Sequence, residues 1–323
     1  MKTLKKLWKY STAFALGILM LIPLAQAAGK GGRSSDSVPV TTTVTATVAN
    51  GKRLPDIRPQ DVVVRQGKDK LRVVDWVPAQ GQRAGLDLFI LIDDASDSHL
   101  GGQLADLRDF ISHQPASTSI GIGYMRNTTV EIVQPFTRDH VRTANTLRLP
   151  FGSPGAFSSP YLSTIDLLKR WPDSGNRREV IMITDGIDRT HRHWHWSRGL
   201  HTNPDVESAS RVAQRTGTII HTIYYPGAGP WRNNYWQASS GQMDMARLSS
   251  KTGGQSFYLG LQAPVSFAPW LNNLQRTLDN QYLLSFAANP GKKPALQAVR
   301  LDTEVAGVNL ATQEAVWVPG NRQ

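Results

Sequence analysis

The feature that most constrains the fold of this chain is the segment at residues 86–98, which reads LDLFILIDDASDS. It begins as a nearly continuous apolar run, which is typical of a central parallel strand buried on both faces by helices. It ends in Asp94-x-Ser96-x-Ser98, so one carboxylate and two hydroxyl groups leave the carboxyl end of the strand together. In open α/β sheets this edge binds ligands, and such oxygens form a hard-ligand set suited to Mg²⁺ or a similar cation.

A second buried strand is predicted at residues 179–186, which read EVIMITDG. Together with the first motif, and with helical patterns between the two, its TDG ending resembles the von Willebrand factor type A (VWA) domain family. The resemblance covers residues 85–279. More narrowly, the whole chain resembles bacterial secreted VWA-like proteins that carry short β segments before and after this domain.

The resemblance implies a metal-ion-dependent adhesion site, the MIDAS of that family. Asp94, Ser96 and Ser98 would form its first loop, and Asp185 would join through a bound water. The implied ion is Mg²⁺, or else Mn²⁺ or Ca²⁺. One coordination position would stay open for an acidic residue of a protein partner, so the resemblance implies protein–protein binding through a divalent cation.

The family's remaining ligand is a Thr on the loop before the middle helix, and here no Thr stands in that setting. Ser158 is taken as the nearest match, with Ser159 as the alternative, and Thr164 is expected one turn into the helix. Asp93 and Asp97 add negative charge beside the site, where they would raise its affinity for a cation or be solvated.

A second interpretation needs no metal. Ser96 and Ser98 would cap a helix that starts near Leu100, and Asp185 would end its strand in a turn. The chain would then be a structural or scaffold protein with a degenerate, metal-free VWA site.

An enzyme is not predicted, because the sequence has no G-x-S-x-G elbow, no H-E-x-x-H motif and no P-loop. The loop at residues 191–201 holds four histidines, and such a tract can bind a transition metal. A metal-dependent hydrolase that uses this loop is therefore a third hypothesis. A contact loop in which His193, Trp194, His195 and Trp196 touch a partner is the preferred one.

Strands alternate with helices over residues 85–279, which predicts an α/β fold with a doubly wound, mostly parallel, Rossmann-like sheet. Residues 118–125 and 130–136 should form an antiparallel hairpin at its edge. Residues 39–84 and 280–323 hold only short strands, which would expose open edges if they stayed apart. They are therefore expected to combine in one small β-sandwich, with the VWA-like domain inserted between them.

Several finer predictions accompany this plan. Asn50-Gly51 is a strong signal for a two-residue hairpin turn. Residues 71–76 are expected to form one strand. Residues 100–111 have helical spacing, and a further helix is expected to start at Met243.

The first 27 residues have the pattern of a signal peptide, with four lysines, an apolar core and an Ala25-Gln26-Ala27 cleavage site. The alternative is an uncleaved anchor, but the apolar run is short for a membrane span. Residues 28–38 then read as a flexible leader, and the mature protein would be periplasmic or extracellular, with no transmembrane segment.

Composition narrows the choice of partners. Removal of the four lysines of the signal peptide takes the formal net charge from +11 to +7, so the mature chain stays basic and favours acidic partners or anionic surfaces. No nucleic-acid motif is present, and export argues against such a role. Cysteine is absent, so neither disulfides nor thiol chemistry contribute.

Overall fold

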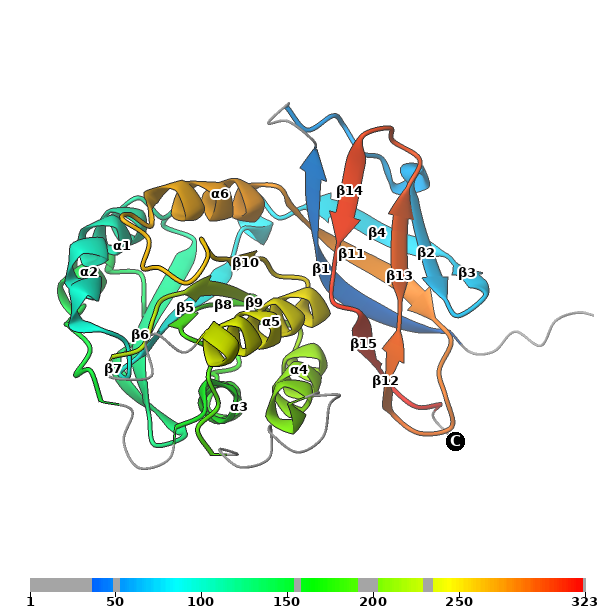
Figure 1. The fold of residues 1–323 in the computed structure, drawn as a ribbon. Coiled ribbons are helices and arrows are strands. Elements are labelled where there is room, and N and C mark those ends of the chain that lie inside the picture. Colours follow the sequence, from blue (N-terminus) through cyan, green and yellow to red (C-terminus); the bar gives the residue numbers. More distant parts are fainter. Residues whose placement is uncertain (1–36, 49–52, 154–157, 191–202, 229–234, 322–323) are drawn as a thin grey trace, which may run out of the picture. The chain divides into compact units, whose positions relative to one another are not determined.

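A computed structural model describes residues 37–48, 53–153, 158–190, 203–228 and 235–321 of the chain. Its centre is a six-stranded sheet in the order β10-β9-β8-β5-β6-β7 (Figure 1). Neighbouring strands are parallel except β7, which pairs antiparallel with β6 at one edge, as the sequence predicts. The strands are β5 (Leu86–Asp93), β6 (Thr118–Arg126), β7 (Thr129–Thr137), β8 (Arg177–Thr184), β9 (Thr218–Tyr224) and β10 (Ser256–Phe257).

Strand β5 lies in the middle because its residues are apolar on both faces, and all eight are buried. Leu88 and Ile90 belong to one hydrophobic core, whereas Phe89 and Leu91 point to the other side and belong to a second core. The continuous apolar run therefore has the outcome expected of a strand covered by helices on both sides.

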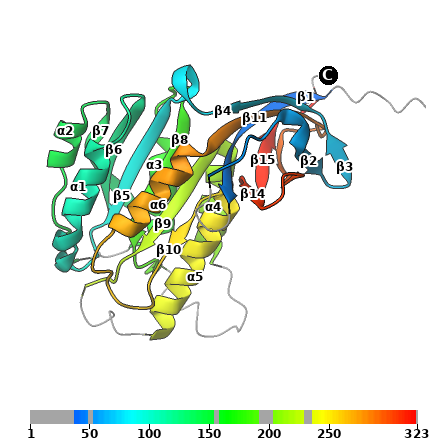
Figure 2. The same ribbon diagram turned by 90° about the horizontal axis from the view of Figure 1, so that it is seen from above.

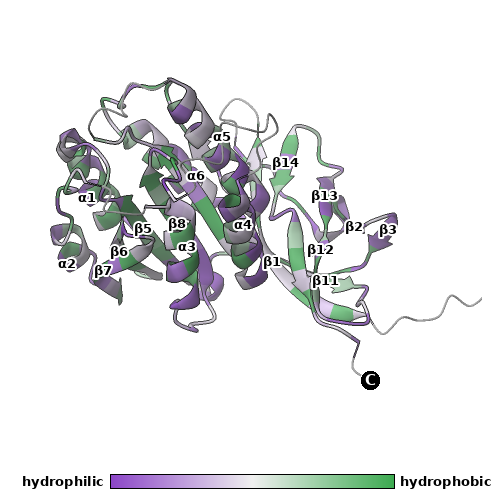
Figure 3. Ribbon diagram, turned by 60° about the horizontal axis from the view of Figure 1, so that its bottom comes forward, coloured by the Kyte–Doolittle hydropathy of each residue, from purple (hydrophilic) through white to green (hydrophobic). Residues whose placement is uncertain are grey.

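The helices form two layers (Figure 2), and the central strands between them are predominantly hydrophobic (Figure 3). Side chains of α1, α2 and α6 pack in the first core, and those of α3, α4 and α5 pack in the second. The helices are α1 (Leu104–Ser112), α2 (His140–Asn145), α3 (Pro160–Lys169), α4 (Pro204–Thr216), α5 (Tyr235–Thr252) and α6 (Ala268–Asp279).

The strand order fixes the position of the site. Counted along the chain from β5, the order across the sheet is that of a doubly wound fold, and the winding direction reverses between β5 and β8. Ligands of open α/β sheets bind at the carboxyl ends of the strands at such a reversal. Asp94 and Asp185 follow directly after β5 and β8, so both predicted carboxylates lie at this point.

The flanking segments form a separate β core. Strand β1 pairs with β11 and β14, β11 also pairs with β4, and β13 pairs with β2, so strands from before and after the α/β part share sheets. Trp76 stacks on Tyr282 with ring centroids 4.4 Å apart, which joins the two halves of this module. The predicted fold class is confirmed. The strands are β1 (Val38–Val48), β2 (Val62–Gln66), β3 (Asp69–Leu71), β4 (Val73–Pro78), β11 (Gln281–Ala288), β12 (Ala295–Ala298), β13 (Arg300–Thr303), β14 (Val308–Ala311) and β15 (Ala315–Val318).

Some local predictions are wrong. Asn50-Gly51 falls outside the described residues, but no hairpin joins β1 to β2, because β1 pairs with β11 and β14 instead. Residues 71–76 are split between β3 and β4, which belong to different sheets.

Two helix starts also differ from the prediction. A 3-10 helix, η4 (Ser98–Gln103), precedes α1, and its Gly101 and Gly102 are poor α-helix formers. Helix α5 begins at Tyr235 rather than Met243. Within the described part of the chain, no helix combines the length and the apolar character needed to cross a membrane. The predicted signal peptide lies outside those residues.

Candidate binding site at the carboxyl end of the central sheet

Asp93 and Thr184 tie the ends of β5 and β8 together. The Thr184 hydroxyl donates to Asp93 Oδ2 at 2.7 Å, and the backbone N–H of Ala95 donates to Asp93 Oδ1 at 2.8 Å. Burial, followed by the nearby charge of Asp185, raises the pKa of Asp93 to about 6, although Arg189 and the two hydrogen bonds oppose this rise. Asp93 is thus a structural carboxylate beneath the site.

Asp94 is held by an arginine. Its side chain is completely buried, and both of its oxygens accept hydrogen bonds from the Arg148 guanidinium, at 2.7 and 3.0 Å. The Phe151 N–H donates to the same carboxylate at 3.3 Å. Burial lowers the pKa of Arg148, but the hydrogen bonds and charge of Asp94 outweigh it and raise the net pKa. This is a bidentate ion pair of the strong type.

Asp185 is held in the same way. The Arg189 guanidinium donates to its two oxygens at 2.6 and 3.4 Å, and the Ile187 N–H donates at 2.9 Å. Burial lowers the pKa of Arg189, but the Asp185 and Asp93 charges more than compensate and raise it. Gly227 makes room for this pair, because a Cβ there would lie 2.4 Å from Asp185 Oδ2.

The two serines of the first motif are placed differently. Ser96 is buried, forms an isolated bridge to Gly227, and its hydroxyl has no hydrogen-bond partner among the described residues. Ser98 is exposed at the first position of η4. Neither serine caps this helix, because Asp97 is the N-cap residue and accepts from the His99 N–H at 3.0 Å. The capping interpretation is therefore wrong in its choice of residues.

The loop before α3 places its hydroxyl groups near the Asp185 side of the site. Ser158 is buried, and its carbonyl accepts from the Arg189 N–H at 2.7 Å. Ser159 caps α3 and donates to Asp188 Oδ2 at 2.9 Å, so its hydroxyl serves the fold. Thr164 lies inside the helix and donates to the Pro160 carbonyl, as expected for a residue that is not a ligand.

The arrangement of these residues does not fit a bound divalent cation. Both oxygens of Asp94 and both oxygens of Asp185 already accept from guanidinium groups. Among the described residues, no group of three or more His, Cys, Asp or Glu side chains is placed to hold a metal ion. Mg²⁺ binding through Asp94, Ser96, Ser98, Asp185 and Ser158 stays a prediction from the resemblance.

The sequence analysis identified neither of the two arginines that pair with these carboxylates. Arg148 is 54 positions from Asp94, so only the tertiary fold brings them together. Arg189 follows Asp185 by four positions, a spacing that would have been a usable signal for pairing with that carboxylate.

Exposed apolar side chains gather around the same end of the sheet. Eleven large hydrophobic side chains are exposed among the described residues, and eight of them belong to loops at this end or to the first half of α5. Gln103 of η4 donates to the Pro264 and Val265 carbonyls, and Gln242 of α5 donates to the Gly260 carbonyl. These bonds connect η4 and α5 to the loop after β10. We call this set the apolar rim: Leu149, Phe151, Tyr235, Trp236, Met243, Tyr258, Leu259 and Val265.

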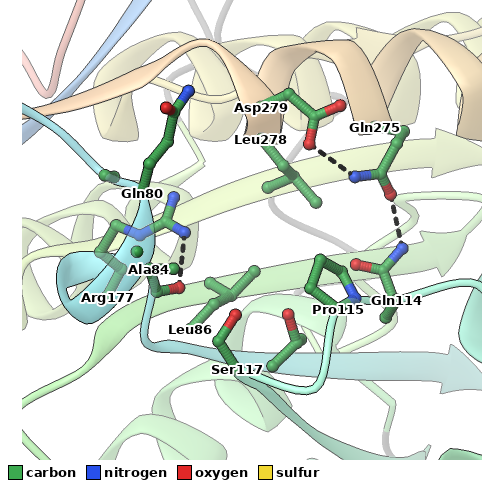
Figure 4. Close-up of a pocket in the computed structure, with 13 residues that line it drawn as sticks. Gln80, Ala84, Leu86, Gln114, Pro115, Ser117, Arg177, Gln275, Leu278 and Asp279 are labelled. Carbon is green, nitrogen blue, oxygen red and sulfur yellow. Dashed lines mark hydrogen bonds between the residues drawn. The ribbon is translucent and has the colours of Figure 1, made fainter.

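A cavity of about 410 Å³ lies at the opposite end of the sheet, beside the first residues of β5, β6 and β8 (Figure 4). Its polar side chains bond chiefly to the protein itself. Arg177 donates to the Ala84 carbonyl, and Gln275 bonds with both Gln114 and Asp279. This cavity lacks the converging carboxylates of the first site. The histidine and tryptophan residues 193–196 of the predicted contact loop lie outside the described residues.

No protein-family model matches the chain, and no functionally curated protein matches it significantly. Solved structures are similar at low identity. An aerotolerance-related membrane protein from Bacteroides fragilis is 10% identical, with a TM-score of 0.43 over 60% of this chain and 99% of that one. BatB from Bacteroides thetaiotaomicron is 13% identical, with a TM-score of 0.42 over 59% and 97% of the two chains.

The ArnB paralog VWA2 from Sulfolobus acidocaldarius is 10% identical, with a TM-score of 0.37 over 88% of this chain and 76% of that one. Similarity at this level says nothing of ligands. The strand order, the antiparallel edge strand and the positions of Asp94 and Asp185 at the reversal point agree with the predicted domain. The central part of this chain therefore has a VWA-like fold.

Proposed function

We propose that this chain is an exported protein-binding protein, whose VWA-like domain holds a protein partner on the apolar rim. The observation that supports this most comes from the described part of the chain, where eight of eleven exposed large hydrophobic side chains are concentrated at one end of the sheet. Scattered exposed apolar residues are normal, but a gathered set that includes aromatic side chains is typical of an interaction surface.

The chemistry of the partner follows from the rim and from charge. Trp236 is 78% exposed and Leu259 is 70% exposed, so both are available as anchors for an apolar surface. The guanidinium carbon of Arg126 lies 5.4 Å from the centroid of the Phe151 ring. The predicted mature chain carries a net charge of +7, because loss of the four signal-peptide lysines lowers the formal charge from +11. A partner with apolar side chains flanked by acidic ones would complement this surface.

Apolar contact is better supported than capture of a partner carboxylate through a cation, because the two carboxylates that would hold the cation are paired with arginines. Two features of the sequence support export. One is the predicted signal peptide, and the other is the resemblance to secreted VWA-like proteins with flanking β segments.

The test compares two triple variants as immobilised baits in an envelope extract of the producing cell. Trp236→Ser, Leu259→Ser and Val265→Ser together remove anchors from the apolar rim. The matched control replaces three exposed hydrophobic residues that lie elsewhere, Val74, Ile132 and Val141, by Ser.

A partner retained by the wild type and by the control, but lost by the rim variant, is the expected result. Equal retention by both triple variants, with both proteins folded by circular dichroism, would contradict the proposal.

A further inference from the structure

The two arginine side chains at this site are held in place by the surrounding residues. Arg148 lies between two aromatic rings, with its guanidinium carbon 3.7 Å from the Tyr124 centroid and 4.1 Å from the Phe151 centroid. The Tyr124 hydroxyl accepts from the Arg148 N–H at 2.8 Å and donates to the Arg148 carbonyl at 2.7 Å. The side chain and the backbone of this residue are thus both fixed where Asp94 needs a cation.

Arg189 is fixed by different means. Its backbone N–H donates to the Ser158 carbonyl at 2.7 Å, and its guanidinium also donates to the Ile187 carbonyl at 3.2 Å. Only 15% of its side chain and 4% of that of Asp185 is exposed. The absence of a side chain at Gly227 leaves space for the pair, since a Cβ would lie 3.1 Å from Arg189 Nη2.

Each of the two strand-end carboxylates has a guanidinium partner of its own, while Asp93 and Asp188 place further negative charge beside Arg189. Two carboxylates, Asp94 and Asp185, face two guanidinium groups, and each arginine donates to both oxygens of its partner. A divalent cation placed between the carboxylates would be close to both positive side chains and would have to displace them, because like charges repel strongly where solvent is excluded.

We propose that Arg148 and Arg189 take the place of the divalent cation in this VWA-like site, so that the chain needs no metal to keep the two strand ends together. The idea concerns the isolated chain and does not depend on the apolar rim or on the partner. It also explains why the motif can keep its carboxylates while it loses the Thr ligand of the related family.

The first test uses the complete purified protein, with Mn²⁺ followed by electron paramagnetic resonance and with thermal melts in Mg²⁺ or EDTA. The expected result is that the free Mn²⁺ signal is unchanged by equimolar protein at submillimolar concentration. The melting temperature should also be the same in EDTA and in millimolar Mg²⁺. Stoichiometric loss of the Mn²⁺ signal, or a melting temperature several degrees higher in Mg²⁺ than in EDTA, would overturn the proposal.

The second test removes the built-in cations. Arg148→Ala with Arg189→Ala frees both carboxylates beside the unpartnered Ser96 hydroxyl, so this variant should be less stable in EDTA and should regain melting temperature as Mg²⁺ is added. Arg83→Ala is the matched control, because its pair with Asp75 is exposed on both sides. Variant melts that do not respond to Mg²⁺ would contradict the idea that the arginines occupy a cation position.

If the double variant does not fold in EDTA, refolding in Mg²⁺ gives the same distinction. Recovery of the native far-ultraviolet spectrum only with the cation supports the proposal, whereas failure in both buffers counts against it. Because no partner is used, these results are separate from the outcome of the rim experiment.

Discussion

The coupling energy between Arg148 and Asp94 should be far larger than that of an ordinary pair of exposed charges. Asp94 is fully buried and Arg148 is 26% exposed, and two hydrogen bonds of 2.7 and 3.0 Å join them. Removal of one partner from a buried pair typically costs about 3–5 kcal/mol, because the other charge is left without compensation. The partial exposure of Arg148 places Arg148→Met near the lower end, at about 3 kcal/mol.

A double-mutant cycle with Asp94→Asn isolates the pair. Because the double variant leaves no unpaired buried charge, its loss in free energy of unfolding should be smaller than the sum of the single losses. The coupling energy should be about 1–3 kcal/mol. Met at position 148 keeps an apolar contact with Tyr124 and Phe151, so lost stacking contributes little.

The assay is urea unfolding followed by tryptophan fluorescence, with the free energy taken from linear extrapolation. The control cycle uses Arg83→Met and Asp75→Asn, whose side chains are 52% and 48% exposed at a separation of 3.1 Å. Exposed pairs contribute about 0–1 kcal/mol. A coupling energy for Arg148 and Asp94 no larger than that of the control would refute the reasoning.

Two further predictions concern the surroundings of the site. Gly227→Ala places a Cβ 2.4 Å from Asp185 Oδ2, so overpacking should lower the free energy of unfolding by about 1–3 kcal/mol. Gly102→Ala is the control, because the space around Gly102 is open, and it should change the free energy of unfolding far less. Urea unfolding of both variants checks this prediction. Burial is the main cause that raises the pKa of Asp244 from its usual 3.8 to about 6. The Asn203 hydrogen bond and the charge of Arg247 oppose this rise, whereas the charges of Asp188 and Glu207 add to it. The folded chain therefore holds a proton that the unfolded chain has released between these pH values, so this group makes stability fall as pH rises from 4 to 6. Asp244→Asn should remove that part of the fall, and melting temperatures of variant and wild type that stay parallel over this range would contradict the assignment.

Much of the fold was predictable because it depends on local patterns that tertiary structure reinforces. The apolar run of β5 could be buried only in the middle of a sheet, and the short flanking strands needed each other to form a core. The prediction that the strands of residues 39–84 and 280–323 combine followed from that need, although the individual pairings and their register did not.

The details that failed depend on contacts distant in sequence. A turn signal such as Asn50-Gly51 predicts a hairpin only if the next strand is the best available partner, and here β11 and β14 take that place. Helix α5 starts earlier than predicted because its first turns carry exposed aromatic residues, Tyr235 and Trp236, which interrupt the apolar periodicity.

The site shows the same division. The sequence places Asp94 and Asp185 at adjacent strand ends, since that follows from strand order. It does not specify whether a metal ion or a guanidinium balances them, because carboxylates at a strand end are compatible with both. In the structure Arg148 pairs with Asp94, and it reaches that carboxylate only through the tertiary fold.

The central claim, a partner-binding apolar rim at a metal-free site, is tested most directly by hydrogen exchange on the complex with the captured partner, kept in EDTA throughout. Amides of η4 and of residues 147–153 and 258–265 should exchange more slowly in the complex than in the free protein, and those of β2 and β3 should be unchanged. Dissociation of the complex in EDTA, or slowed exchange confined to the β module, would contradict the account.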